Sequence, residues 1–151
     1  MAANVSHSVR LHERVSALLH LRRQRLTPTR RRIVDVLENA DRPLTIPEIL
    51  DAQPGLAQSS AYRNLVVLEQ ARVVHRLVTH ADFARYELAE DLTGHHHHLV
   101  CSNGGRVDDL PATAAVERSV ADAVDEAARR AGFRTEHHRL DLVGLCADCT
   151  G

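Results

Sequence analysis

The stretch 59–71, SSAYRNLVVLEQA, decides how the first half of the chain folds. Ala61 and Leu65 have the spacing of one helix face, and Ser59 or Ser60 can cap the first turn. Hydroxyl groups and backbone N–H groups at the start of a helix suit contacts with phosphate. The sequence therefore predicts a helix over 59–71 whose first turn is suited to binding an anion.

Helices are predicted before this stretch and a hairpin after it. Apolar spacing and capping patterns indicate three helices, over 8–24, from Pro28, and from the capping box Thr45-Ile46-Pro47-Glu48. Two short strands follow, 73–79 and 83–88, joined at 80–82. Short helices followed by a hairpin are the order of a winged helix-turn-helix domain, in which 59–71 is the recognition helix.

The second half of the chain predicts a small α/β unit behind a hinge. The polar segment 89–94 ends in glycine and is the candidate hinge. Beyond it the pattern predicts strands over 95–101 and 106–109, a long amphipathic helix that ends at Gly132, and a last strand over 133–145. The predicted class is α+β, with a winged-helix domain over 1–88, the hinge over 89–94 and an α/β domain over 95–151.

Composition and charge limit the functions that the chain can have. Of its 151 residues 44% are hydrophobic and 3% aromatic, which is typical of a globular protein and excludes an aromatic base-stacking platform. No apolar run is long enough to span a membrane and the first residues have no secretory pattern, so we expect a cytoplasmic protein without a membrane partner. All nineteen basic residues are arginine; residues 1–85 carry a net charge of +5 and residues 86–151 carry −6. This asymmetry favours an anion-binding first half, with a solvated charged helix face as the alternative.

The run His95-His96-His97-His98 is the strongest sign of chemistry. On a strand, His95 and His97 point to one face and His96 and His98 to the other. This geometry predicts two imidazoles for each of two metal sites. A solvated polar strand is the alternative.

The second sign is Cys146-Ala147-Asp148-Cys149, because two residues between thiols let both sulfurs reach one metal ion. A disulfide and a thioredoxin-like redox motif are the alternatives. A partner knuckle for tetrahedral zinc should start at Cys101, but position 104 is glycine. Three thiols remain, on Cys101, Cys146 and Cys149, and the fourth ligand cannot be named.

These motifs, in this order and spacing, resemble the Fur family of metal-responsive repressors. The resemblance covers nearly the whole chain and rests on five stretches: 26–30 (LTPTR), 60–65 (SAYRNL), 86–88 (YEL), the histidine run with 99–101 (LVC), and 146–149 (CADC). It implies a winged-helix domain and an α/β dimerisation domain. It also implies a homodimer that binds a palindromic double-stranded DNA operator when loaded with metal and so represses metal-homeostasis genes.

Three metal sites are implied by the same resemblance. A hinge sensor site would use His75, Glu87, His96 and His98, with Asp91 as a substitute ligand. A second site would use His95, His97, Glu117 and His138. An incomplete thiolate zinc site would use Cys101, Cys146 and Cys149, because Gly104 stands where the family usually has a cysteine. Zinc is implied as a cofactor, and the imidazole and carboxylate donors of the sensor site suit Fe(II), Mn(II), Ni(II) or Zn(II). The zinc-sensing branch often has a cysteine in its hinge site, and this chain has none to spare.

Candidate DNA contacts are Arg30, Ser59, Ser60, Tyr62 and Arg63. Arg63 can read a guanine edge, and Tyr62 can touch a thymine methyl group or a phosphate. Three other functions compete with a DNA-binding metal sensor. A zinc enzyme would need a placed nucleophile or base, and the sequence has no HExxH motif, so we expect no enzymatic activity. A peroxide sensor on the same fold, in which iron at the hinge oxidises a ligand histidine, has the same pattern. A metal-storage protein would not need the arginine-rich winged helix.

Overall fold

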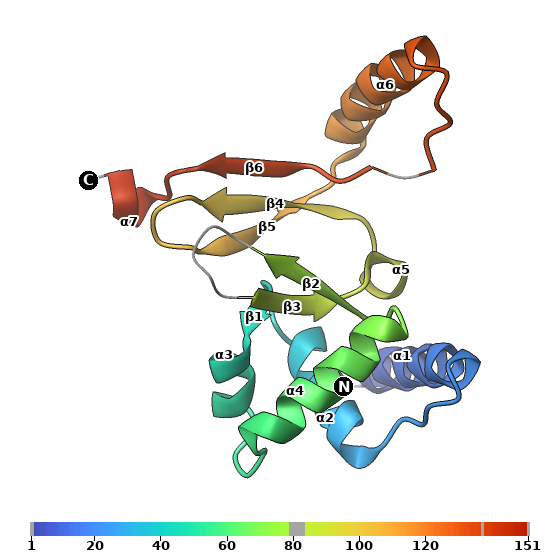
Figure 1. The fold of residues 1–151 in the computed structure, drawn as a ribbon, viewed down its shortest axis with the longest axis vertical. Helices are drawn as coiled ribbons and strands as arrows, with labels where there is room; N and C mark the ends of the chain where they lie inside the picture. The colour runs from blue at the N-terminus through green and yellow to red at the C-terminus, as the bar shows by residue number, and fades with distance from the viewer. Residues whose placement is uncertain (1, 79–83, 137, 151) are drawn as a thin grey trace. The chain divides into compact units, whose positions relative to one another are not determined.

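The computed structural model describes residues 2–78, 84–136 and 138–150, and the chain divides into two compact units (Figure 1). The first unit, Met1–Gly94, contains α1 (Ala2–Leu21), α2 (Pro28–Glu38), β1 (Leu44–Thr45), α3 (Ile46–Asp51), α4 (Gln58–Gln70), β2 (Val74–Val78), β3 (Ala84–Leu88) and α5 (Glu90–Thr93). The second unit, His95–Gly151, contains β4 (His96–Cys101), β5 (Val107–Pro111), α6 (Ala114–Arg130), β6 (Asp141–Gly144) and α7 (Ala147–Thr150).

The first unit has the predicted order of helices followed by an antiparallel pair of strands. Its sheet has the order β1-β3-β2, and α2, α3 and α4 lie on one side of it (Figure 1). Apolar side chains from helices α1 to α4 form one buried core, with Val15, Ile33, Ile49 and Leu68 as examples. The two-residue strand β1 is too short to show a sequence pattern and was not predicted. The turn expected at 80–82 lies outside the described residues.

The starts of three helices can be compared with their predictions. Pro28 lies in the first turn of α2, as predicted, and Thr27 caps the helix, with its side chain accepting from the backbone N–H of Arg30. At α4 the prediction of a serine cap is wrong, because the helix begins one residue earlier, at Gln58, with Ala57 at the cap and no side-chain cap bond. A second difference lies in α1, which begins at Ala2 rather than at residue 8.

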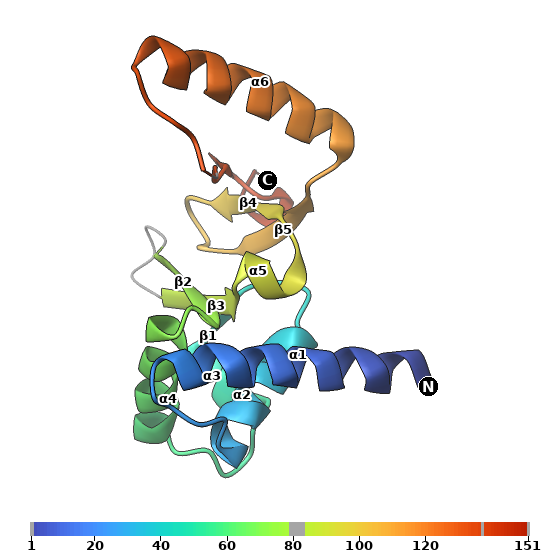
Figure 2. The same cartoon turned by 90° about the vertical axis from the view of Figure 1, so that its right-hand side faces the viewer.

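The segment 89–94, expected to be a polar hinge, contains the short helix α5. Helix α5 follows β3 directly along the chain (Figure 2). Leu92 is buried in the core of the first unit, and the guanidinium of Arg14 on α1 donates to the carbonyl oxygens of Asp91 and Leu92. Gly94 follows with φ +103°, a conformation that favours glycine. Within this segment, only Gly94 has a backbone conformation that favours glycine.

The second unit is a three-stranded sheet with the order β5-β4-β6. Strand β4 pairs antiparallel with β5 and parallel with β6, and α6 lies between β5 and β6 in the chain. The expected strand over 133–145 is wrong in length, because only Asp141–Gly144 pairs with β4. The CxxC motif runs into the short helix α7.

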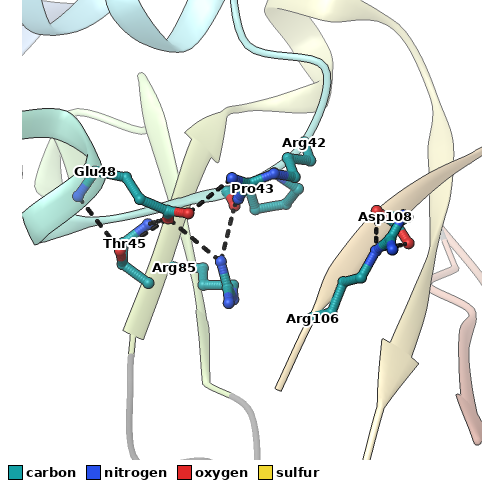
Figure 3. A network of polar contacts seen from close by, with 7 residues as sticks. All are labelled: Arg42, Pro43, Thr45, Glu48, Arg85, Arg106 and Asp108. Atoms are coloured by element: carbon teal, nitrogen blue, oxygen red, sulfur yellow. Dashed lines mark hydrogen bonds and ion pairs between the residues drawn. The ribbon is translucent and has the colours of Figure 1, made fainter. Parts of the chain in front are cut away.

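A polar network ties α3 to the sheet of the first unit (Figure 3). Thr45 and Glu48 form the predicted capping box, in which Glu48 accepts from the Thr45 backbone at 2.7 Å. The same carboxylate accepts from Arg42 at 2.7 Å and from Arg85 at 3.4 Å. Burial raises the pKa of Glu48, but the hydrogen bonds from Arg42 and Thr45 outweigh it and lower the pKa from 4.5 to about 2.

We expect Glu48→Gln to lower the free energy of unfolding by about 1–2 kcal/mol at neutral pH, a modest value because water screens this partly exposed carboxylate. The folded pKa lies below the unfolded one, so the stabilisation is complete above pH 4.5 and is lost as the pH falls towards 2. Urea unfolding of both proteins at pH 7 and at pH 3 measures this difference. The control is Glu13→Gln, which removes an exposed carboxylate on α1. A difference that is the same at both pH values would contradict the assignment.

Candidate metal centres and nucleic-acid interface

Helix α4 has one face in the core and one in solvent. Ala61 and Leu65 are buried, whereas Tyr62 is 50% exposed and Arg63 is exposed beside it. The guanidinium of Arg63 donates only to the carbonyl oxygen of Ser59, one turn earlier, at 3.3 Å among the described contacts. Both predicted base-contacting side chains therefore lie on the accessible face of the predicted recognition helix.

Arg30 differs from the other candidate DNA contacts because its side chain connects α2 to α4 through a hydrogen bond. Its Nε donates to Asn64 Oδ1 on α4 at 3.1 Å, and its Nη1 donates to the carbonyl oxygen of Arg25 at 2.6 Å. The Asn64 amide in turn donates to the carbonyl oxygen of Ser60 at 2.8 Å. Arg30 thus positions the first turn of α4, a role that the sequence did not reveal.

In the first unit, two of the predicted sensor-site residues face each other on adjacent strands. His75 on β2 pairs in register with Glu87 on β3, and His75 Nδ1 lies 3.1 Å from Glu87 Oε1. Glu87 is buried, and a buried carboxylate is costly unless a cation or hydrogen-bond donors compensate it. Asp91, the substitute ligand, is exposed on α5.

In the second unit, the other two sensor-site residues share one face of β4. The rings of His96 and His98 are 5.1 Å apart, and these side chains and Asp109 on β5 offer ligand atoms within 4.8 Å of one another. His98 Nδ1 also lies 3.1 Å from Asp141 Oδ1 on β6. Asp109 was missed, because nothing in the sequence shows that β5 pairs with β4 in the register that places it opposite His98.

The opposite face of the histidine run gathers a second group. His95, His97, Glu117 and His138 offer ligand atoms within 4.8 Å of one another. Glu117, on the first turn of α6, lies 2.7 Å from His97, 3.3 Å from His95 and 3.4 Å from His138. His138 was expected on the last strand, but it lies before β6.

These four donors fit a metal ion. His97 is fully buried, and its Nδ1 has no hydrogen-bond partner among the described residues. A buried ring nitrogen without a hydrogen-bond partner is unfavourable, and a cation shared with the Glu117 carboxylate would compensate it. Imidazole and carboxylate together suit Zn²⁺ and other divalent transition metals.

The three thiols gather at the other end of β4. The sulfur atoms of Cys101, Cys146 and Cys149 lie within 4.8 Å of one another. Backbone amides of Cys146 and Gly104 donate to Cys101 Sγ at 3.4 Å each and lower the pKa of Cys101 from 9.0 to about 6. A hydrogen bond with the Cys146 thiol raises the pKa of Cys149. Cys101 is thus the thiol most readily converted to the thiolate that metals bind.

Position 104 faces this thiol cluster. A Cβ built on Gly104 would lie 3.3 Å from Cys149 Sγ and 3.9 Å from Cys101 Sγ, so a side chain here would enter the space beside the sulfurs. Gly104 has no positive φ, whereas its neighbour Gly105 has φ +64°. The backbone conformation therefore favours glycine at position 105 and not at position 104. Position 104 offers no fourth ligand only because glycine has no side chain.

Comparison with known proteins places these features in a family. Residues 22–143 match the sequence profile of the ferric uptake regulator family. The chain belongs to the ferric uptake regulator family. It is 31% identical to the ferric uptake regulation protein of Bacillus subtilis over 92% of this chain and 94% of that protein. It is 30% identical to the peroxide operon regulator of the same organism, again over 92% and 94%.

A solved structure of the family has the same fold. The Helicobacter pylori ferric uptake regulator superposes with a TM-score of 0.74 at 22% identity, over 95% of this chain and 94% of that one, and its structure is described as having three functional metal binding sites.

Family membership decides the class of function. Ferric uptake regulators are metal-responsive transcriptional regulators that bind DNA, and this chain is one of them. The family thus favours transcriptional regulation over the zinc-enzyme and metal-storage interpretations. Among the described residues, the helices are too short or too polar to cross a membrane.

Proposed function

We propose that the protein is a repressor of metal-homeostasis genes whose affinity for a palindromic operator is controlled by metal at a hinge sensor site. The site would use His75 and Glu87 from the first unit and His96 and His98 from the second. The observation that carries the proposal is that each unit gathers its donors on one strand surface, a buried carboxylate with an imidazole in one and two imidazoles with Asp109 in the other.

Control of DNA binding follows from the distribution of these donors. His75 and Glu87 move with α4, because β2 and β3 share its core, whereas His96 and His98 move with β4. All four side chains reach one ion only in a limited range of orientations of the two units. A divalent ion bound by all four supplies coordination energy that is available only in that range. The orientation of α4 relative to the second unit is thereby selected.

We propose a homodimer held by the second unit. None of the 17 residues of α6, all of which the structure describes, is buried, although the helix is amphipathic. Leu142, Val143 and Leu145 are also 46%, 58% and 54% exposed. An exposed apolar face of this extent marks a protein interface, and a two-fold dimer would present two α4 helices to the two halves of a palindrome.

The metal that is sensed is testable with DNA. Duplexes selected from a random-sequence pool by the metal-loaded protein would serve as the probe, and their affinity would be measured with Fe(II), Mn(II), Ni(II), Zn(II) and Mg(II). We expect transition metals to support binding and Mg(II) to fail, because imidazole donors favour the former. Palindromic selected duplexes and a complex of two chains per duplex support the homodimer. Equal affinity with every metal would contradict metal control at this site.

Arg63→Ala tests the recognition helix. We expect a loss of about 1–3 kcal/mol in binding to the selected duplex and relaxed preference at one position in each half-site, because a bidentate contact to guanine is removed. Arg63→Lys separates charge from geometry, since lysine keeps the charge but cannot make the planar two-bond contact. Competition between selected and random duplexes measures the preference. If alanine weakens both duplexes equally, Arg63 contacts phosphate rather than a base.

Peroxide sensing is a second candidate, favoured by the likeness to the peroxide operon regulator of Bacillus subtilis. On this alternative, His96 and His98 would help to hold Fe(II), which would reduce hydrogen peroxide, so that one peroxide oxygen would be added to a ligand histidine and the other would leave as water. Mass spectrometry of the Fe(II)-loaded protein after hydrogen peroxide treatment would then show one added oxygen on the peptide that contains His96 and His98. The Mn(II)-loaded protein is the control. Release of DNA with unmodified histidines would contradict peroxide sensing by this route.

A further inference from the structure

The thiol cluster differs in kind from the other metal centres because only three donors converge on it. Cys101 is buried, Cys146 and Cys149 are half-buried, and all three sulfurs lie within 4.8 Å of one another. These are also the only cysteines in the chain. The cluster joins β4 to the turn and short helix that end the second unit.

A closed zinc site does not fit this cluster. Structural zinc takes four protein ligands in a tetrahedron. Over the described ranges, no His, Asp or Glu joins the three thiols in a four-ligand group. Asp148, between the two C-terminal cysteines, is 79% exposed and lies 3.4 Å from Arg106, which also holds Asp108 (Figure 3). The fourth corner is the space beside Gly104, where a side chain would start 3.3 Å from Cys149 Sγ.

We propose that the Cys101–Cys146–Cys149 cluster is a binding site for a thiophilic ion that is stable with three sulfur ligands and no fourth, trivalent arsenic being the clearest example. Such ions carry a lone pair that occupies the fourth direction, so an open corner costs them nothing. Zinc in the same cluster would have to complete its tetrahedron with water or a small molecule. The number of ligands, more than their type, therefore determines which ion this site prefers.

The reaction with arsenite needs no oxidant or reductant. Each thiol replaces one hydroxyl group of As(OH)₃, so three As–S bonds form and three As–O bonds break. The three thiol protons leave with the three hydroxyl groups as water. Arsenic remains trivalent, and the sulfurs are not oxidised.

The test uses the full chain, reduced and as purified, titrated with arsenite. Free thiols are counted with a chromogenic thiol reagent, arsenic per chain is measured after dialysis, and zinc release is followed with an indicator. We expect free thiols to fall from three to none per chain at one equivalent of arsenite, with one arsenic retained and any zinc bound by the three thiols released. A chain that retains arsenic but keeps one thiol free would overturn the proposal, because two thiols alone would then be the site.

Two variants sharpen this test. Cys146→Ser should lose its arsenic during the same dialysis while keeping the circular dichroism spectrum of the natural protein. If that variant fails to fold, the thiol count on the natural chain still decides. Gly104→Cys should reverse the preference, so that with equal zinc and arsenite the variant ends with zinc and the natural protein with arsenic. A natural protein that retains no arsenic in this competition would overturn the proposal. DNA binding is not part of the readout, so the result is independent of the hinge sensor site.

Discussion

The double substitution His96→Ala with His98→Ala should abolish the dependence of DNA binding on metal while leaving the chain folded. The two imidazoles share one face of β4, and their rings are 5.1 Å apart. Without them the second unit offers the hinge ion no imidazole, so the coordination energy that selects one orientation is lost. Coupling between two sites changes affinity by about 5–150-fold, and we expect the variant to lose all of it. Fluorescence anisotropy with a labelled operator duplex, with and without chelator, measures the coupling.

The control for this variant is His20→Ala, which removes an exposed imidazole from α1. It should keep the full metal dependence. Asp109→Asn adds a graded test, because Asp109 lies opposite His98 across β4 and β5 and offers an oxygen to the same group. We expect it to weaken the metal dependence without removing it. A double variant that still responds to metal as the natural protein does would show that these histidines are not the sensor.

The second large effect is expected from Gly104→Cys. Zinc bound in the natural cluster would have only three thiol ligands, so mild chelation should remove it with little unfolding, whereas four thiols should retain it. Residue 104 has no positive φ, and a Cβ there would lie 3.3 Å from Cys149 Sγ, so the prediction requires the Cys149 side chain to shift by a few tenths of an ångström. If completing the site adds about 2 kcal/mol, the melting temperature of a chain of this size rises by about 4–8 °C.

Elemental analysis after dialysis against chelator, together with thermal unfolding, checks this prediction. Gly105→Cys is the matched control, because it adds a thiol one residue away at a position with φ +64°, where a side chain is strained. It should lower the melting temperature and retain no additional zinc. If the natural protein keeps one tightly held zinc per chain and Gly104→Cys keeps no more, a well-placed fourth ligand already exists and the incomplete-site account is wrong.

Local signals explain what could be predicted from the sequence. The capping box at Thr45 and Glu48 and the proline after Thr27 involve residues within one turn, so their geometry follows from spacing alone. The alternation of His95 to His98 likewise follows from the two-residue repeat of a strand. These features allow the starts of α2 and α3 and the division of the histidines into two groups to be predicted from the sequence.

Non-local contacts explain what could not be predicted. Asp109 joins His96 and His98 only through the register of β4 with β5, and Arg30 braces α4 through Asn64, a partner 34 positions away in the sequence. The segment 89–94 is polar in composition, yet Leu92 anchors it in the core and Arg14 caps its carbonyl oxygens. Tertiary contacts determine the conformation of such a segment, and these contacts cannot be read from its composition.

Metal control of DNA binding is the central claim, and the affinity of the natural protein for a selected operator duplex tests it most directly. The protein would be titrated into labelled duplex with one to two equivalents of the supporting metal per chain, then with excess chelator, then with metal restored. We predict an affinity that falls by about 5–150-fold on chelation and recovers when metal returns. An affinity that is the same in all three conditions, in a protein whose metal content has changed, would contradict the claim.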